Sequence, residues 1–520
     1  MKPGLFFLWP VDRYRERTAL VLGEERLTFG QTDAAINRLC HGLLSLGLHT
    51  GHKVAVLMGN CLEAAFSIFA IPRAGLTYVT LNARHSAREH LEVLQDAGVD
   101  ALIAGEEFID LIQPVLDQAA GLKHLIALGP ERPGWLSYEA LTAGQDETWP
   151  EIEVDPENDI ERIHYTSGTT GRPKGAVWPF AMSKRVIASI LMNMDKPLGP
   201  ADVNLNIGPL THAAGLMMMV YYCRGATNIV LPRFDEKLVL STIERERVTS
   251  VLLIPTMLYR ILARNDLADY DLSSVNRVWY GTAPMAVDRL RQGIELFGSV
   301  FRQNYGMTEI PQPITFLGPE DHITQGSAGE VRRLSSAGRP ALGVEVRVVD
   351  EQGNDLSSGQ IGEIIIRCDK MISGYWNLPQ ETAAAFRDGW FHTHDMGTWD
   401  QSGFLYIMDR KNDMIITGGF NVYPREVEEV IMELEGVAEV VAIGVPDPLW
   451  GEAVKALVVL QPGWEVNTET ILEHCRKNLA GYKMPKSVDY IQAAPKNLYG
   501  KIDRRALREP YWSGAGRRVN

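Results

Sequence analysis

Hydrophobic and polar positions in the first third of the chain follow two different periods. Residues 27–48 carry apolar side chains three and four positions apart, which predicts an amphipathic helix. Short apolar runs, which predict buried strands, then alternate with further helical patterns. The predicted strands are 54–58, 78–80 and 101–104, and the predicted helices are 62–71 and 87–96. Strands that alternate with helices indicate parallel α/β layers.

The alternation continues with predicted strands at 204–209, 227–231, 250–254, 278–281 and 301–305. From Ala341 the pattern changes to short strands with turn signals, which predicts a small β-rich subdomain. A charged junction at 409–413 follows, and an amphipathic segment at 426–432 then begins a compact α+β unit. Its other predicted elements are strands 437–443, 456–460 and 488–491 and a helix at 469–479.

Composition excludes several classes of protein. A chain of 520 residues is longer than one ordinary domain. The formal net charge of −14 argues against a broad nucleic-acid face, so we expect no nucleic-acid partner. The five scattered cysteines, without a C-x-x-C pair, predict reduced thiols in a cytoplasmic protein. The apolar runs near the start and at 213–223 are too short to cross a bilayer, although peripheral membrane contact stays open.

The segment 165–177, YTSGTTGRPKGAV, has the composition of a phosphate-binding loop. Its glycines let backbone N–H groups approach an anion closely, its hydroxyls add neutral donors, and Lys174 adds a positive charge. The Walker spacing G-x-x-x-x-G-K-[ST] is absent. From composition alone, an ordinary surface loop is as good an interpretation as a phosphate-binding loop.

Three further segments carry candidate chemistry. Thr308 and Glu309 in YGMTE either cap a helix or, beside a triphosphate, bind the α-phosphate and Mg²⁺. Asp395 in WFHTHD can accept two ribose hydroxyls, which we prefer to a metal site built from the nearby histidines. Lys501, after a glycine near the end, is by itself an ordinary solvated charge. His85 and His90 are interpreted as part of a solvated helix face.

Six segments in order, spanning residues 166–507, resemble the signatures of the adenylate-forming superfamily, and most closely those of acyl-CoA synthetases. They are TSGTTGRPKG, GTAP, YGMTE, WFHTHD, DRKND with GGFNVYPREVE, and GKIDRRAL. The resemblance implies a large N-terminal domain at 1–409, a small mobile C-terminal domain at 410–520, and a hinge near 409–413. It also implies that a carboxylate attacks the α-phosphate of MgATP to give acyl-AMP, and that the CoA thiol then displaces AMP. ATP, Mg²⁺, CoA and a carboxylic acid are the implied ligands.

The resemblance also implies roles for individual residues. The expected catalytic residues are Lys174, Thr308, Glu309 and Lys501, with Glu309 and Thr169 at the metal. The expected nucleotide-binding residues are Thr166, Ser167, Gly168, Thr169, Thr170, Gly171, Lys174, Gly281, Thr282, Ala283, Pro284, Asn304, Tyr305, Gly306, Met307, Thr308, Asp395, Arg410 and Lys501. Gly418, Gly419 and Phe420 are expected on the CoA path.

Two positions depart from the family pattern. His394 stands where the family usually has glycine, and Asn412 stands at the hinge, where Asp or Lys is usual. Asparagine tolerates unusual backbone angles. For His394 we expect ordinary backbone angles, a ring directed away from the nucleotide, and no catalytic role.

The acyl pocket is expected at His212, Ala213, Ala214, Gly215 and Met217. No acid lies there to bind a substrate amine, so an α-amino acid is disfavoured, and the apolar run favours a medium- or long-chain fatty acid or another hydrophobic acid, with an aryl acid second. Packing of a helix explains the methionines equally well. Alternatives are an acyl-AMP ligase that loads a carrier protein, a luciferase-like oxidase and a non-enzymatic descendant. We expect a monomer or a homodimer.

Overall fold

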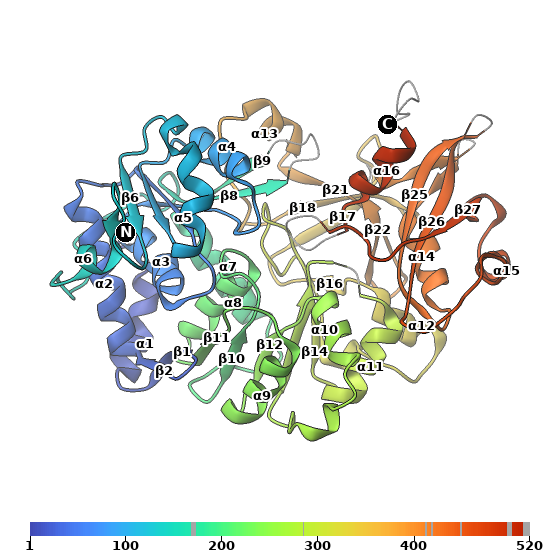
Figure 1. The fold of residues 1–520 in the computed structure, drawn as a ribbon. Helices are drawn as coiled ribbons and strands as arrows, with labels where there is room; N and C mark the ends of the chain where they lie inside the picture. The colour runs from blue at the N-terminus through green and yellow to red at the C-terminus, as the bar shows by residue number, and fades with distance from the viewer. Residues whose placement is uncertain are drawn as a thin grey trace.

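The computed structural model of the protein describes residues 1–167, 173–283, 285–410, 413–417, 420–447, 450–496 and 502–512; for Ser167, Asp409 and Arg410 it describes the backbone alone. Figure 1 shows a blue N-terminal part on the left, a green part below it and an orange to red C-terminal unit on the right. Layered sheets with helices between and around them confirm the α/β fold predicted from the sequence.

Two large sheets form the N-terminal part. The first has the strand order β16-β15-β14-β13-β12-β10-β11-β1-β2, and the second has the order β19-β9-β8-β4-β3-β5-β6-β7. The first contains β1 (Thr18–Leu22), β2 (Glu25–Thr28), β10 (Val203–Asn206), β11 (Thr227–Val230), β12 (Ser250–Leu252), β13 (Arg277–Gly281), β14 (Phe301–Tyr305), β15 (Thr315–Leu317) and β16 (Arg339–Pro340). The second contains β3 (Lys53–Leu57), β4 (Thr77–Thr80), β5 (Ala101–Ala104), β6 (His124–Ala127), β7 (Leu136–Ser137), β8 (Ile160–Ser167), β9 (Pro173–Pro179) and β19 (Gly374–Tyr375).

Two smaller sheets follow. The β-rich subdomain predicted after Ala341 is present, and its strands are β17 (Glu345–Val349), β18 (Gly362–Arg367), β20 (Phe386–Arg387), β21 (Trp390–Trp399) and β22 (Leu405–Arg410). The C-terminal sheet contains β23 (Ile415–Thr417), β24 (Phe420–Val422), β25 (Val437–Asp447), β26 (Gly451–Leu460) and β27 (Ser487–Tyr490). The last strand of one sheet ends at Arg410, inside the charged junction at 409–413, and the first strand of the next begins at Ile415.

The helices of the described residues include those predicted at 27–48, 62–71, 87–96 and 469–479, together with others that the pattern did not predict. They are α1 (Leu8–Tyr14), α2 (Phe29–Ser45), α3 (Leu62–Arg73), α4 (Ala87–Ala97), α5 (Glu106–Ile112), α6 (Tyr138–Thr142), α7 (Phe180–Met192), α8 (Ala213–Tyr222), α9 (Glu236–Glu246), α10 (Pro255–Leu262), α11 (Val287–Phe297), α12 (Ala328–Arg332), α13 (Pro379–Ala385), α14 (Pro424–Met432), α15 (Thr468–Asn478) and α16 (Arg504–Trp512). Capping boxes at Thr28 and Ser86 start α2 and α4. None of the helices within the described ranges is long and apolar enough to cross a membrane.

The main hydrophobic core lies between the two large sheets, around α3, α7 and α8. Helix α8 is apolar on almost every face, with the sequence AAGLMMMVYY, and such a helix is stable only where it is buried all round. Between the sheets it meets that condition, and its N-terminal end reaches the edge at which the candidate residues lie.

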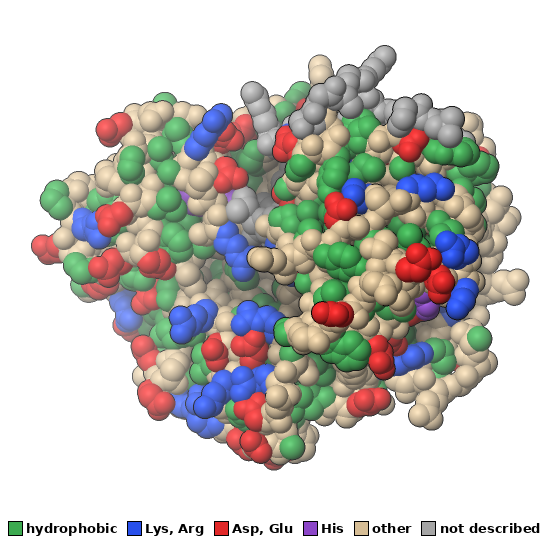
Figure 2. Space-filling model, turned by 45° about the vertical axis from the view of Figure 1, so that its right-hand side comes forward, with side chains coloured by type: hydrophobic (Ala, Val, Ile, Leu, Met, Phe, Trp, Pro, Cys, Tyr) green, Lys and Arg blue, Asp and Glu red, His purple; other side chains and the backbone are tan. Residues whose placement is uncertain are grey.

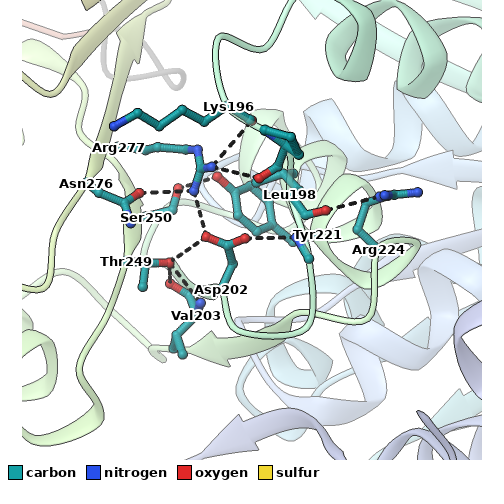
Figure 3. Close-up of polar contacts among 12 residues, drawn as sticks. Lys196, Leu198, Asp202, Val203, Tyr221, Arg224, Thr249, Ser250, Asn276 and Arg277 are labelled. Atoms are coloured by element: carbon teal, nitrogen blue, oxygen red, sulfur yellow. Dashed lines mark hydrogen bonds and ion pairs between the residues drawn. The ribbon is translucent and has the colours of Figure 1, made fainter. Parts of the chain in front are cut away.

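A buried polar network closes the opposite edge of the first sheet (Figure 3). Arg277 at the start of β13 donates to Asp202 Oδ1 at 2.6 Å and to the carbonyl oxygen of Pro197 at 3.1 Å. Thr249, before β12, also donates to Asp202. The network joins the amino ends of three neighbouring strands, so it stabilises the sheet while the carboxyl ends remain available for ligands, as is usual in α/β sheets.

Candidate active site

A cleft of about 2530 Å³ brings the candidate segments together. Residues from β4, β8, β9, α8, β13, β14, β21 and the C-terminal unit line it. Figure 2 shows the surface hollowed here, with blue Lys and Arg side chains beside the hollow. Arg233, Arg260 and Arg289 are among the lining residues. A concave site with convergent polar groups is the usual form of a small-molecule site.

The candidate phosphate loop connects β8 and β9, which pair as antiparallel strands. Thr166 lies opposite Lys174 in this pair, and both line the cleft. Lys174 Nζ lies 5.3 Å from the centre of the Tyr375 ring. Gly168, Thr169, Thr170 and Gly171 lie outside the described residues, as does the side chain of Ser167. The described part therefore places a hydroxyl and an ammonium group at the two ends of the loop.

The carboxyl ends of β13 and β14 form the second wall. A Cβ on Gly281 would lie 2.3 Å from the carbonyl oxygen of Asn304, so only glycine permits this close approach. Thr282 follows with φ +66°, an unusual angle for a β-branched residue. Asn304 Oδ1 is buried and has no hydrogen-bond partner among the described residues. A buried acceptor without a partner is suited to an amino group of a ligand such as adenine. Ala283 and Gly306 also line the cleft, and Pro284 lies outside the described residues.

The segment Met307-Thr308-Glu309 is held by bonds from three residues of two other segments. Trp178 Nε1 donates to the Thr308 carbonyl oxygen at 3.1 Å, and Ile372 N donates to the Glu309 carbonyl oxygen at 3.0 Å. Tyr375 Oη donates to Glu309 Oε1 at 2.9 Å. The segment is not helical, so the helix-cap interpretation of Thr308 and Glu309 is wrong. Glu309 lines the cleft with an oxygen available, and a carboxylate beside bound phosphates suits Mg²⁺.

Sequence reasoning missed Lys370, which supports the same segment. Its buried ammonium group donates to the carbonyl oxygens of Pro311 and Pro313, each at 2.7 Å. Burial lowers the pKa of Lys370 to about 8. A neutral amine retains two N–H donors, so both bonds survive deprotonation. No motif signal marks such a lysine, because its partners lie almost sixty residues away in the sequence.

Asp395 is buried at the start of the pair formed by β21 and β22. Tyr305 Oη donates to its Oδ2 at 2.5 Å, and its own backbone N–H donates to Thr393 Oγ1 at 3.0 Å. Asp395 lies opposite Arg410 in the β21–β22 pair, which brings two expected ribose-binding residues to one place. The bond from Tyr305 fixes the carboxylate at the same edge as β14. A carboxylate has about four acceptor sites, so Asp395 can accept from hydroxyl donors in addition to Tyr305.

The expectation of ordinary backbone angles at His394 is wrong. His394 has φ +58°, in the left-handed region that glycine adopts without strain. Its backbone N–H lies 3.2 Å and its Nδ1 lies 3.3 Å from Glu363 Oε1. Glu363 also contacts His392. Histidine is one of the residue types that tolerate this region, and the contacts with Glu363 hold it there.

Replacing His394 with glycine is expected to relieve about 1 kcal/mol of backbone strain and to leave the ATP KM and kcat within a few-fold of wild type. The backbone N–H bond to Glu363 remains in this variant, and the exposed imidazole contact that is lost contributes little, because solvent screens it. Thermal unfolding and steady-state kinetics check the two parts separately. A loss of turnover, or a sharp gain, would show that the His394 side chain takes part in or inhibits the reaction.

Helix α8 begins directly after His212, and its first turn forms one side of the cleft. Ala213, Ala214, Gly215 and His212 line the cleft as expected. A Cβ on Gly215 would lie 1.9 Å from the Leu210 carbonyl oxygen, so Gly215 is required for this turn. Met217 does not line the cleft but is buried in the main core, where it packs the helix. Met219, of the same apolar run that the sequence suggested for the pocket, does line the cleft. Arg162 and His164 of β8 line it as well, and the sequence did not indicate these two as pocket residues.

His85 and His90 are buried, so their assignment to a solvated helix face is wrong. His85 lines the cleft, and the two rings lie 5.7 Å apart. Burial, and then the neighbouring His85, lower the pKa of His90 to about 4, so His90 is neutral at physiological pH. His90 lies on the buried face of α4, and His85 directly precedes the Ser86 cap of that helix.

The C-terminal unit contributes the remaining side of the cleft. Lys496, Ile502 and Arg504 line it, and Lys496 forms an isolated β-bridge with Ile502. Phe420 is 54% exposed and stacks on Tyr482 at 4.8 Å. Asn412, Gly418, Gly419 and Lys501 lie outside the described residues. The chain on both sides of residues 497–501 therefore borders the cleft.

Comparisons with known proteins agree with this geometry. A family model described as AMP-binding enzyme matches residues 7–376, and one described as AMP-binding enzyme C-terminal domain matches residues 426–501. The chain is 37% identical to the medium/long-chain-fatty-acid–CoA ligase FadD8 of Mycobacterium tuberculosis, over 99% of this chain and 91% of the relative. It is 35% identical to the feruloyl-CoA synthase of Amycolatopsis sp, over 97% and 98%.

The solved structure of the anthranilate CoA ligase AuaEII in complex with anthranoyl-AMP has the same fold. It superposes with a TM-score of 0.89 at 26% identity, over 97% of this chain and 96% of that one. The family model covers most of the chain, and the relatives cover almost all of it. This chain belongs to the family of AMP-binding enzymes.

Proposed function

We propose that the protein is an AMP-forming carboxylate–CoA ligase that acts on a medium- or long-chain fatty acid or another hydrophobic carboxylic acid. One observation carries the proposal: a single cleft joins the phosphate-loop strands, Glu309, Asp395 and the start of helix α8. A nucleoside triphosphate and a carboxylate need to meet at one place for acyl-AMP to form. The relatives that act on fatty and aryl acids support the choice of acid–thiol ligation.

In the first half-reaction, an oxygen of the acid attacks the α-phosphorus of ATP, and the bond to pyrophosphate breaks. Thr166 and Lys174 would hold the leaving phosphates together with Ser167, Gly168, Thr169, Thr170 and Gly171. Thr308 would donate to the α-phosphate, and Lys501 would stabilise the charge that develops there. Glu309, with Thr169, would hold the Mg²⁺ that neutralises the phosphates.

The nucleoside would lie along the ends of β13, β14 and β21. Asn304 would accept from the adenine amino group beside Gly281, Thr282, Ala283, Pro284, Tyr305, Gly306 and Met307. Asp395 would accept the ribose hydroxyls, with Arg410 beside it. These groups position the α-phosphorus next to the end of α8, where the acid binds.

In the second half-reaction, the CoA sulfur attacks the acyl carbon and the bond to AMP breaks. We propose that the unit after residue 410 turns about Asn412 and brings Gly418, Gly419 and Phe420 to the cleft, where they border the pantetheine path. The two half-reactions thus use different faces of the same small domain.

A pyrophosphate-release screen over carboxylic acids, with and without CoA, tests the proposed function. We expect saturable, ATP-dependent activity with a medium- or long-chain fatty acid or a hydrophobic aryl acid, and acyl-CoA as the product. Glycine, alanine and dicarboxylates should be poor substrates. Pyrophosphate release without any acyl-CoA would indicate a carrier-protein acceptor, and a preference for charged amino acids would contradict the proposed pocket.

Substituting leucine for Gly419 is expected to separate the half-reactions. The added side chain would block the pantetheine path, so pyrophosphate release should continue while acyl-CoA formation falls at least about tenfold, the cost of a poor fit at a crowded site. Gly481→Leu is the matched control, because a side chain there meets open space in the same unit. Acyl-CoA formation at the wild-type rate in Gly419→Leu would rule out this path.

A further inference from the structure

One wall of the cleft is formed by a single face of strand β8. Side chains alternate along a strand, so Arg162, His164 and Thr166 share one face, and all three line the cleft. Helix α8 lies opposite these residues. Its first residue, Ala213, and Met219, nearly two turns later, both line the cleft. These residues define a channel, here called the acyl channel, which runs inward from the phosphate loop between β8 and α8.

The inner end of the acyl channel is closed and polar. Arg162 Nη2 contacts Met219 Sδ at 3.3 Å and the Ile68 carbonyl oxygen at 3.2 Å. Arg162 Nε donates to Glu161 Oε1 at 2.7 Å, and Ser183 Oγ donates to the same oxygen at 2.6 Å. Both charged groups are almost fully buried. Their charges cancel, so the floor offers no net charge to a substrate.

The depth of the channel follows from its two walls. Four residues of strand separate Arg162 from Thr166, which corresponds to roughly 13 Å. Six residues of helix separate Ala213 from Met219, which corresponds to about 9 Å. The channel therefore holds an acid with a body on the order of 10 Å long, such as an aryl or medium-chain acid.

His164 is the polar group on the side of this channel. Its Nδ1 lies 3.3 Å from Thr80 Oγ1, on the neighbouring strand β4, and its ring centre lies 4.7 Å from that of Trp178. No described residue forms a hydrogen bond with its Nε2. Burial, and then the charge of Arg162, lower the pKa of His164 to about 3. The imidazole is therefore neutral, and one nitrogen is left for a ligand.

We propose that the natural acid carries a hydroxyl group that hydrogen-bonds to Nε2 of His164 in the acyl channel. This inference rests on the proposed function and names its substrate class: a compact hydroxy-substituted carboxylic acid, phenolic or aliphatic. A hydroxyl pairs with either tautomer of a neutral imidazole, because it both donates and accepts. A second carboxylate or an ammonium group would be buried beside a floor without net charge, which is costly.

Matched pairs of acids test the proposal: 4-hydroxycinnamate with cinnamate, and 8-hydroxyoctanoate with octanoate. In the wild-type protein, kcat/KM for pyrophosphate release should be about tenfold higher for the hydroxylated member of at least one pair. His164→Leu should reduce that advantage to within about twofold, while His164→Gln, which is similar in size and keeps a donor and an acceptor, should retain most of it. The ATP KM should stay unchanged in both variants.

His124→Leu, on β6 outside the cleft, controls for the loss of a histidine as such. Equal use of both members of each pair by the wild type would overturn the proposal, as would an unchanged advantage in His164→Leu. The wild-type comparison stands even if a variant fails to fold. A wild-type protein that adenylates none of the four acids would instead contradict the proposed function.

Discussion

Substituting alanine for Lys501 is expected to slow acyl-AMP formation by roughly two to three decades, the usual cost of losing one preorganised group that stabilises developing charge. The described residues on both sides of this segment, Lys496 and Ile502, line the cleft, which supports the role proposed for Lys501. The first half-reaction moves negative charge onto the phosphates, and a cation placed there stabilises that change.

The thioester half-reaction, started from supplied acyl-AMP, should survive in Lys501→Ala, because that step no longer involves pyrophosphate as the leaving group. Pyrophosphate release and acyl-CoA formation from acyl-AMP are measured separately. Lys486→Ala is the control, since Lys486 is an exposed lysine of the same unit. Equal losses of rate in the two half-reactions would show that Lys501 is not specific to acyl-AMP formation.

Asp395→Ala is expected to raise the ATP KM by roughly two decades, because two hydrogen bonds from ribose to a charged acceptor are lost. Because Asp395 is buried, bulk water does not readily take the place of the lost acceptor. The same change leaves Tyr305 Oη without the acceptor that it meets at 2.5 Å. Isothermal titration with a non-hydrolysable ATP analogue measures the loss independently of turnover.

Tyr305→Phe separates the two effects of the Asp395 substitution. It removes the hydrogen bond from Tyr305 Oη to Asp395 but keeps the Asp395 carboxylate. The ATP KM should therefore rise by only about three- to tenfold. If Tyr305→Phe weakens ATP binding as much as Asp395→Ala does, then Asp395 acts by holding Tyr305 and not by binding ribose. An unchanged affinity in Asp395→Ala would exclude the ribose role altogether.

Local pattern sufficed where a residue's role depends on its immediate neighbours in the chain. The alternation of strands and helices predicted the layered fold. The period of apolar residues decides whether a segment buries one face as a helix or as a strand. Gly281 illustrates the same point at the site, since a strand end followed by GTAP places a glycine where two strands approach closely. The order of motifs was also sufficient to identify the family before any packing was known.

Tertiary packing decided what local pattern left open. Met217 and Met219 belong to one apolar run and are both buried in the main core, and only the position of α8 between the sheets decides that Met219 also lines the cleft. His394 was predicted to be unstrained, but its contacts with Glu363 of a neighbouring strand hold it at φ +58°. Residues 162, 164 and 166 share a face by alternation, yet alternation does not tell which face meets α8. Sequence periodicity fixes relative directions along one element, whereas the surroundings of each face depend on segments that are distant in the chain.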